Sequence, residues 1–154
     1  MRTLLAGITT LILGFDCWAA PECKITGYGV FSDPVEETIV ESTETATGRF
    51  RMDYGTKLVR TTDVVAAILG TSFGVTRVFS GIPDGKMVKL IVHHPPIVSP
   101  TGEARTQSII DVIDETFANA YGFDTPGELV LGEWAFEYKL DERILCKKYF
   151  QVVK

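Results

Sequence analysis

The strongest constraint on the fold is an alternation of apolar and polar residues near the C-terminal end of the chain. In EWAFEYKL (133–140), one set of alternate positions is Trp134, Phe136, Tyr138 and Leu140, and the other is Glu133, Ala135, Glu137 and Lys139. Side chains on a β-strand alternate between its two faces, so this pattern predicts a strand with the tryptophan face buried and Glu137 facing solvent. DER then turns the chain and ILCKKYFQVV returns, which predicts a β-hairpin.

Most of the preceding chain follows the same period of two. Five further segments are rich in β-branched and aromatic residues and are separated by turn residues: 23–31, 37–52, 72–79, 86–95 and 104–113. The segment 37–52 predicts one strand or a pair. Seven or so strands at regular spacing predict an all-β fold, an immunoglobulin-like antiparallel β-sandwich.

Two segments have some helical character. TTDVVAAILG (61–70) and DVIDETFANA (111–120) each have a possible aspartate start. Both are short for stable helices, and the first is rich in β-branched residues. We expect at most one short helix here.

The first nineteen residues have the layout of a secretory signal. Arg2 precedes the apolar run LLAGITTLILGF, and Cys17 and Ala19 occupy a small-x-small cleavage pattern. The run is shorter than the roughly 20 apolar residues that span a bilayer. We predict a cleaved signal helix over 1–19 and a single β-sandwich domain over 20–154, with no membrane span in the mature chain. The alternative is an N-terminal helix retained in the mature domain.

The predicted cleavage decides which of the three cysteines remain in the mature chain. Cys17 leaves with the signal, and the mature chain keeps Cys23 and Cys146. An even pair in an exported protein predicts a disulfide, because the periplasm and the cell exterior are oxidising. This bridge would join the first strand to the last. The rival interpretation is two free thiols in a reducing compartment.

The charge balance excludes one class of partner. The formal net charge is −5, and no cluster of Lys or Arg is present. A protein that binds nucleic acid displaces phosphate counterions with such cations, so a nucleic-acid partner is not expected.

Several motifs then carry a resemblance to a known family. They are TDVVAAILGTSFGVTRVFSGIPDGKMVKL, HHPPIVSPTG, YGF and GELVLGEWAFEYKLDERILCKKYFQV, which together lie within residues 25–152. These motifs resemble the bacterial domain-of-unknown-function family 3859. The matching positions are Gly70, Phe73, Gly74, Pro96, Gly102, Glu128, Leu129, Val130, Gly132, Trp134, Phe136, Leu145, Phe150 and Val152. Gly127, Leu131 and Cys146 depart from the family pattern. The resemblance implies a fold and an exported protein, but no catalytic residues.

Residues able to support catalysis or bind metal are few. His93 and His94 are adjacent, so on a strand they point to opposite faces and do not readily share one metal ion. The acidic pairs lack a spacing that demands acid–base chemistry, and no nucleophile motif is present. The glycines of GTSFG predict close backbone contacts or bulges. We therefore expect no catalytic residues, no metal and no cofactor.

The remaining candidates for function are three tyrosines. Tyr28, Tyr54 and Tyr121 lie beside glycines in loops or at strand ends, where a rigid sandwich presents binding contacts. The sequence thus favours a non-catalytic module, periplasmic or secreted, that binds a protein, peptide or cell-envelope component. The alternative is a small envelope enzyme or metal-binding protein that uses His93 or His94 with nearby carboxylates.

Overall fold

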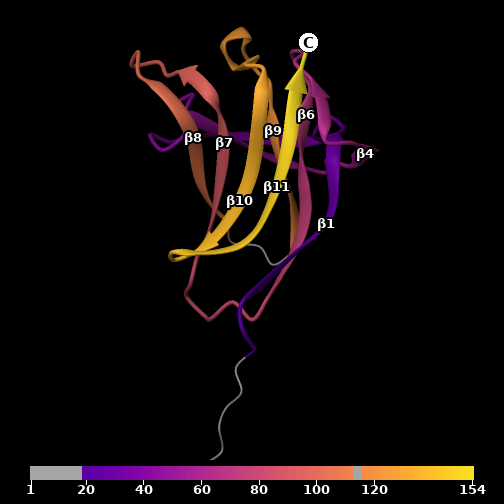
Figure 1. The fold of residues 1–154 in the computed structure, drawn as a ribbon, viewed down its shortest axis with the longest axis vertical. Helices are drawn as coiled ribbons and strands as arrows, with labels where there is room; N and C mark the ends of the chain where they lie inside the picture. The colour runs from indigo at the N-terminus through magenta and orange to yellow at the C-terminus, as the bar shows by residue number, and fades with distance from the viewer. Residues whose placement is uncertain (1–18, 113–115) are drawn as a thin grey trace, which may run out of the picture.

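The computed structural model describes residues 19–112 and 116–154, and its regular elements are almost all β-strands (Figure 1). Within these ranges there are eleven strands and one short 3₁₀ turn, η1 (Pro126–Glu128). Two sheets face each other, and a third sheet of two strands belongs to neither of them. The fold is all-β, as the alternating pattern predicts.

The two main sheets contain four and five strands. The four-stranded sheet runs β4 (Leu58–Thr61), β1 (Glu22–Phe31), β6 (Ser72–Ser80), β9 (Thr116–Gly122). The five-stranded sheet runs β5 (Val64–Ala66), β11 (Arg143–Val153), β10 (Gly132–Leu140), β7 (Val88–Val98), β8 (Ala104–Val112). All pairs are antiparallel except β5 with β11, which is parallel.

The third sheet is the hairpin of β2 (Glu36–Glu41) and β3 (Arg49–Tyr54). A two-stranded hairpin alone is at best marginally stable in water. Its turn is attached to the five-stranded sheet, because the Ala46 N–H donates to Ser108 Oγ at 2.9 Å and the Ile109 N–H donates to the Glu44 carbonyl at 3.0 Å. In Figure 1 the hairpin crosses behind the five-stranded sheet.

Aromatic rings fill the space between the two main sheets. Trp134, Phe136 and Tyr138 are fully buried, so the predicted register of this strand is confirmed. Trp134 lies opposite Phe150 in the β10–β11 ladder and meets Phe73 of the other sheet at a ring-centroid distance of 5.5 Å, edge to face. Edge-to-face contacts of this kind stabilise beyond the area they bury.

The opposite face of β10 differs from the expectation. Glu137 was predicted to face solvent, yet its side chain is only 8% exposed. Lys147 Nζ lies 2.9 Å from one carboxylate oxygen, and His93 Nε2 lies 3.4 Å from the other. Because β10 is flanked by β7 and β11, neighbouring side chains cover the glutamate and neutralise its charge.

The glycine of GTSFG allows two strands to approach closely, as predicted. A Cβ on Gly74 would collide with the Asn119 carbonyl oxygen and would lie 2.8 Å from the Ala120 Cα. Both contacts are backbone atoms of the neighbouring strand β9, which cannot move aside as a side chain can. Glycine is therefore required where β6 and β9 pair.

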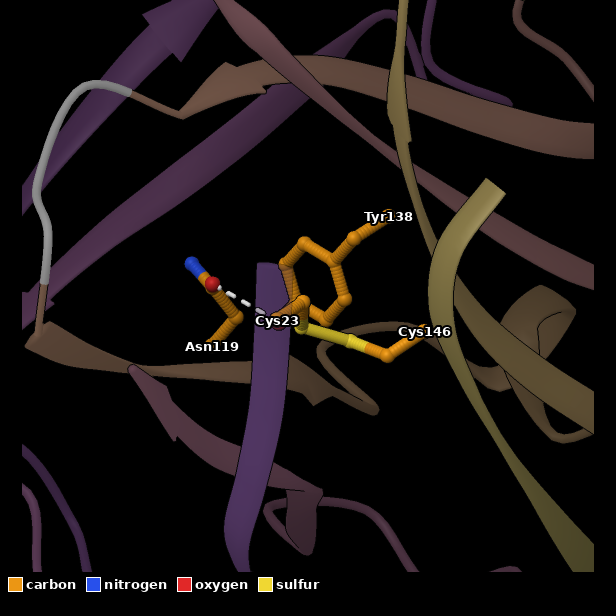
Figure 2. The surroundings of a disulfide bond; sticks show 4 residues. All are labelled: Cys23, Asn119, Tyr138 and Cys146. Carbon is orange, nitrogen blue, oxygen red and sulfur yellow. Dashed lines mark hydrogen bonds between the residues drawn. A yellow bond between two sulfur atoms is a disulfide. The ribbon is translucent and has the colours of Figure 1, made fainter. Parts of the chain in front are cut away.

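The disulfide between Cys23 and Cys146 joins the two sheets near one end of the sandwich (Figure 2). The Cα atoms are 5.6 Å apart, and the residues are separated by 123 positions in sequence. Beside it, the Tyr138 hydroxyl donates to Asn119 Oδ1 at 2.9 Å, which links the same two sheets through side chains. The predicted disulfide between the first and last strands is thus present.

Three sequence expectations need correction or lie outside the described residues. The described residues form eleven strands rather than about seven, because 37–52 forms a pair, the segment 58–66 adds two short strands, and β9 is a further strand. Neither 61–70 nor the described part of 111–120 is helical: Val64–Ala66 form β5, residues 111 and 112 end β8, and 116–120 belong to β9. The predicted signal helix lies almost wholly outside the described residues.

Candidate functional site

A cavity of about 300 Å³ lies along the side of the sandwich where β8 and β9 are the edge strands. Strand β3 of the separate hairpin borders it. Cavities of this volume are at the small end of the range for ligand sites in proteins. This cavity is therefore the candidate functional site.

The deep wall of the cavity combines aliphatic side chains with the fully buried Arg77 of β6. Leu90 and Val92 of β7, with Ile110 and Val112 of β8, contribute branched side chains. Leu90 and Val92 are 2% and 5% exposed and belong to the main core cluster. The cavity therefore opens onto the core of the sandwich between its two sheets.

The mouth of the cavity carries exposed apolar side chains of the hairpin. Ile39, Met52 and Tyr54 line the cavity and are 46%, 38% and 44% exposed. Phe50, which lies on β3 with Met52 and Tyr54, is half-buried. Apolar groups at the mouth that continue an apolar interior are typical of a ligand-binding cleft.

Buried polar groups of the lining bond within the protein. Ser108 Oγ accepts the Ala46 N–H and lies 3.2 Å from His94 Nε2, and Asn119 Oδ1 accepts the Tyr138 hydroxyl. Thr45 Oγ1 donates to backbone carbonyls at 2.9 and 3.1 Å. Polar groups that are satisfied in this way do not require a polar ligand.

Arg51 fastens the hairpin to the body of the sandwich. Its Nε and Nη2 donate to the two oxygens of Asp53 at 2.6 and 3.0 Å, and Nη1 donates to Asp124 Oδ1 at 2.8 Å. Nη2 also lies 3.2 Å from Ser72 Oγ at the start of β6. Burial lowers the Arg51 pKa, but the hydrogen bonds that Arg51 donates to Asp53 and the charges of Asp124, Asp53 and Glu37 outweigh it and raise the pKa overall.

A second network supports the loop that carries Asp124. Glu128 is 4% exposed, and its carboxylate accepts the N–H groups of Asp124 and Thr125 at 3.1 and 2.7 Å. Its other oxygen accepts the Tyr121 hydroxyl at 3.0 Å. Burial, followed by the charge of Glu128, raises the pKa of Tyr121, so the phenol stays protonated.

The three predicted tyrosines occupy different places. Tyr54 and Tyr121 both line the cavity, from β3 and β9. Tyr121 is less exposed than predicted and packs against Trp134 at a centroid distance of 4.9 Å. Tyr28 lies outside the lining, beneath the Lys148 ammonium at 3.7 Å from its ring centroid.

Sequence reasoning missed the polar residues of the site. Arg51 and Asp124 are separated by 73 positions, and no local pattern predicts their contact. The alternation of Arg51 and Asp53 is a local signal, since residues two apart share one face of a strand. This alternation predicts a charged face on the strand that contains both residues.

The two histidines point to opposite faces of the strand, as predicted. His94 is 5% exposed and packs on Trp134, whereas His93 lies beside Glu137 on the outer face. Burial lowers the His94 pKa, the backbone hydrogen bond to Pro95 opposes this, and the neighbouring His93 lowers it further. Within the described ranges, no group of three or more His, Cys, Asp or Glu residues has metal-binding geometry.

Hydrogen bonds through Ser108 and His94 link the hairpin turn to β7. His94 Nδ1 lies 2.9 Å from the Pro95 carbonyl, which assigns the proton to Nδ1 and leaves Nε2 to accept from Ser108. Ser108 in turn holds the hairpin turn through the Ala46 N–H. The chain of bonds therefore connects the β2–β3 turn to β7.

Comparison with known proteins identifies the family. A profile described as "Domain of unknown function (DUF3859)" matches residues 19–152. The chain belongs to this family. The resemblance to this family that the sequence motifs indicate is thus confirmed.

Among solved structures, the DUF3859 chain is similar to a crystal structure described as an immunoglobulin-like protein from Pseudomonas aeruginosa. The two are 26% identical with a TM-score of 0.66, and the match covers 89% of this chain and 99% of the other. The likeness supports the immunoglobulin-like sandwich. A comparison with curated proteins finds no match. No helix within 19–112 or 116–154 is long and apolar enough to cross a membrane.

Proposed function

We propose that this DUF3859 chain is an exported, non-catalytic module that binds a protein, peptide or cell-envelope component in the cavity beside β3. The observation that carries the proposal is a cavity of about 300 Å³ whose interior includes the aliphatic side chains of β7 and β8 and whose mouth carries exposed Ile39, Met52 and Tyr54. Exposed apolar surface that continues into the core costs solvation free energy in the empty protein, and a bound apolar group relieves that cost.

The frame around the cavity supports recognition rather than chemistry. The disulfide and the aromatic core fix the two sheets, and Arg51 fixes the hairpin. A rigid site loses little conformational entropy when a ligand binds, so more of the contact energy appears as affinity.

The test uses an apolar dye and matched variants. N-phenyl-1-naphthylamine fluoresces on entering an apolar site, and we expect the wild-type protein to bind it saturably. Met52→Asp and Tyr54→Asp place a charge at the mouth and should weaken dye binding at least tenfold. Val59→Asp is the control, because Val59 is 62% exposed on β4 and outside the cavity lining. Equal binding by all four proteins, or none by the wild type, would contradict the proposal.

Export is the second part of the proposal. The layout of residues 1–19 and the Cys23–Cys146 disulfide both favour a periplasmic or secreted protein. N-terminal sequencing of the protein recovered from the periplasm or medium should begin at Ala20 or within two residues of it. Soluble mature protein that still begins at Met1 would show the cleavage prediction to be wrong.

A further inference from the structure

We propose that the partner bound at the cavity is an extended peptide segment of another protein, which adds as a strand to the free edge of β9. This inference rests on the proposed function and specifies its partner. It follows from three features of the described residues: the main-chain groups on the edge of β9, the lack of protection of this edge, and the mixed chemistry of the cavity interior.

The edge of β9, rather than one of its faces, lines the cavity. Every residue from 118 to 122 contributes to the lining, although side chains on a strand alternate between its two faces. Asn119 and Tyr121 point toward the core, where they contact side chains of β10. Ala118 and Ala120 have their side chains on the opposite face, so it is their main chain that borders the cavity.

The hydrogen-bond pattern shows which main-chain groups of β9 lie on this edge. The Phe123 N–H donates to the Thr71 carbonyl at 3.0 Å, and these two residues continue the register of the β6–β9 ladder. In an antiparallel ladder, successive residues direct their N–H and carbonyl groups alternately toward and away from the partner strand. Counting back from Phe123, Ala118 and Ala120 direct both groups away from β6, where β9 has no strand partner among the described residues.

The other edges of the two main sheets are short or covered. Strands β4 and β5 have only four and three residues. On β8 the Ile109 N–H donates to the Glu44 carbonyl at 3.0 Å, so the hairpin turn covers that edge. Strand β9 pairs with β6 over seven residues without a bulge and contains no charged residue and no proline. Natural edge strands are commonly protected by such features, so the edge of β9 is suited to accept a further strand.

Strand β3 presents main-chain groups to the same cavity. The Ser42 N–H donates to the Gly48 carbonyl at 2.9 Å, which fixes the alternation along the β2–β3 ladder. Arg51 and Asp53 therefore direct their N–H and carbonyl groups away from β2, and both residues line the cavity. Main-chain donors and acceptors thus border the cavity from two strands, and an extended peptide carries the complementary groups.

The interior suits the side chains of an added strand. Its alternate side chains would point into the cavity, because they continue the core-facing side of β9. There they meet Leu90 and Val92 and the buried Arg77, whose guanidinium lies over the Phe79 ring at 4.3 Å from its centroid. Since only every second side chain enters, the cavity of about 300 Å³ need not hold the whole peptide. Branched apolar residues at alternate positions are therefore the expected pattern of the partner.

The probe is the blocked peptide acetyl-Lys-Val-Thr-Val-Thr-Val-Lys-amide, in which valines alternate with polar residues. Its binding to the isotope-labelled protein is followed by NMR up to millimolar peptide, and amide hydrogen exchange is compared with and without it. We expect the N–H groups of Ala118 and Ala120 to exchange at least about tenfold more slowly in the complex, because each gains a hydrogen bond. Those of Asn119 and Tyr121 should change less, because they already bond to β6. Protection confined to β3, β4, β5 or β8 would overturn the assignment.

A proline variant tests the main chain of β9 directly. Ala120→Pro removes one edge N–H, and its ring obstructs the approach of another strand. Proline is tolerated on an edge strand when the lost N–H faces away from the ladder, so we expect the fold to be retained. Peptide affinity should fall about tenfold. Ala120→Ser is the matched control, because it keeps the N–H and a small side chain, and it should bind like the wild type. If circular dichroism shows that Ala120→Pro does not fold, amide exchange in the wild type decides alone.

The outcomes separate the two proposals. Dye binding at the cavity without slower exchange of Ala118 and Ala120 in the presence of peptide would overturn strand addition and leave the binding module standing. Equal peptide affinity of folded Ala120→Pro and Ala120→Ser would do the same. Failure of the wild type to bind either the dye or the peptide would overturn both proposals. Slower exchange of the two amides at high protein concentration without peptide would identify a second copy of this chain as the occupant and overturn the proposed partner.

Discussion

At the scale of single residues, Trp134 connects the core to the wall of the cavity. Its ring is fully buried, contacts Tyr121, His94 and Phe123 at centroid distances of 4.9, 5.1 and 5.7 Å, and donates from Nε1 to the Val130 carbonyl at 3.1 Å. Tyr121 in turn lines the cavity. The core and the candidate site therefore share a wall of aromatic rings.

Replacing that ring should be costly. Trp134→Ala removes contacts from both sheets and leaves a void, and we expect a loss of about 3–5 kcal/mol in the free energy of unfolding. The control is Tyr149→Ala on the paired strand β11, where the side chain is half exposed and the expected loss is about 0.5 kcal/mol or less. Urea denaturation measures both. Equal effects would mean that the tryptophan face is not the core face.

His94 should make stability depend on pH. Burial lowers its pKa in the folded protein below the ordinary value of 6.5. As pH falls below about 6.5, the unfolded chain takes up a proton that the folded protein does not, so stability declines, by at most ~1.4 kcal/mol per pH unit. Above that pH the neutral ring is favoured in both states and the contribution is complete.

The measurement compares unfolding free energies at pH 7.5 and 5.5 for the wild type and His94→Gln. The substitution removes the titrating group, so the variant should lose less stability than the wild type over this interval. Identical pH slopes in the wild type and His94→Gln would contradict the assignment.

At the scale of elements, the β2–β3 hairpin depends on a few polar contacts. Arg51 joins β3 to Asp124 and Ser72, and Ser108 holds the turn. Elements with few buried apolar contacts open locally at lower free energy than the core does. The hairpin is therefore the part of the cavity wall most able to move.

Arg51→Met should loosen this hairpin selectively. Without the bonds to Asp124 and Ser72, we expect faster hydrogen exchange in 36–54 and little change in β10. Arg51→Lys should also exchange faster than wild type, because an ammonium cannot reproduce the forked contact with Asp53. Hydrogen exchange is measured by mass spectrometry on peptides from 36–54 and from β10. Equal protection of 36–54 in all three proteins would contradict the role of Arg51 in holding the hairpin.

Which elements the sequence could predict depends on how local their partners are. The β10–β11 hairpin follows from the alternation around Trp134, because its register is fixed by one turn. The strand β5 could not be predicted, because its three residues become a strand only by pairing in parallel with β11. The paired residues Val64 and Gln151 are 87 positions apart in sequence. The cavity was missed for the same reason: its walls come from strands far apart in sequence.

At the scale of the whole molecule, the disulfide closes almost the entire domain into one loop. Cys23 and Cys146 are 123 positions apart. In the chain-entropy model a loop of this size stabilises the folded state by roughly 4–5 kcal/mol, because it restricts the unfolded ensemble. It also anchors β1, whose start would otherwise be free to fray.

The corresponding variant is Cys23→Ser with Cys146→Ser. We expect its unfolding free energy to fall by about that amount, with the secondary structure retained. Alkylation of the wild type under denaturing conditions without reductant, followed by mass measurement, should add no label. Two labels per mature chain would show that the thiols are free in the purified protein.

The position of β11 between β5 and β10 also affects how the chain reaches its native state. This strand follows the other described strands in sequence and is synthesised after them, yet it lies between β10 and β5, contributes Phe150 to the core and supplies Cys146. Pairing of β5, closure of the core and oxidation of the thiols all wait for residues 143–153. Until then the nascent chain exposes the apolar faces of β7 and β10, so folding becomes cooperative only once β11 is available, and the chain is most prone to aggregation before that point.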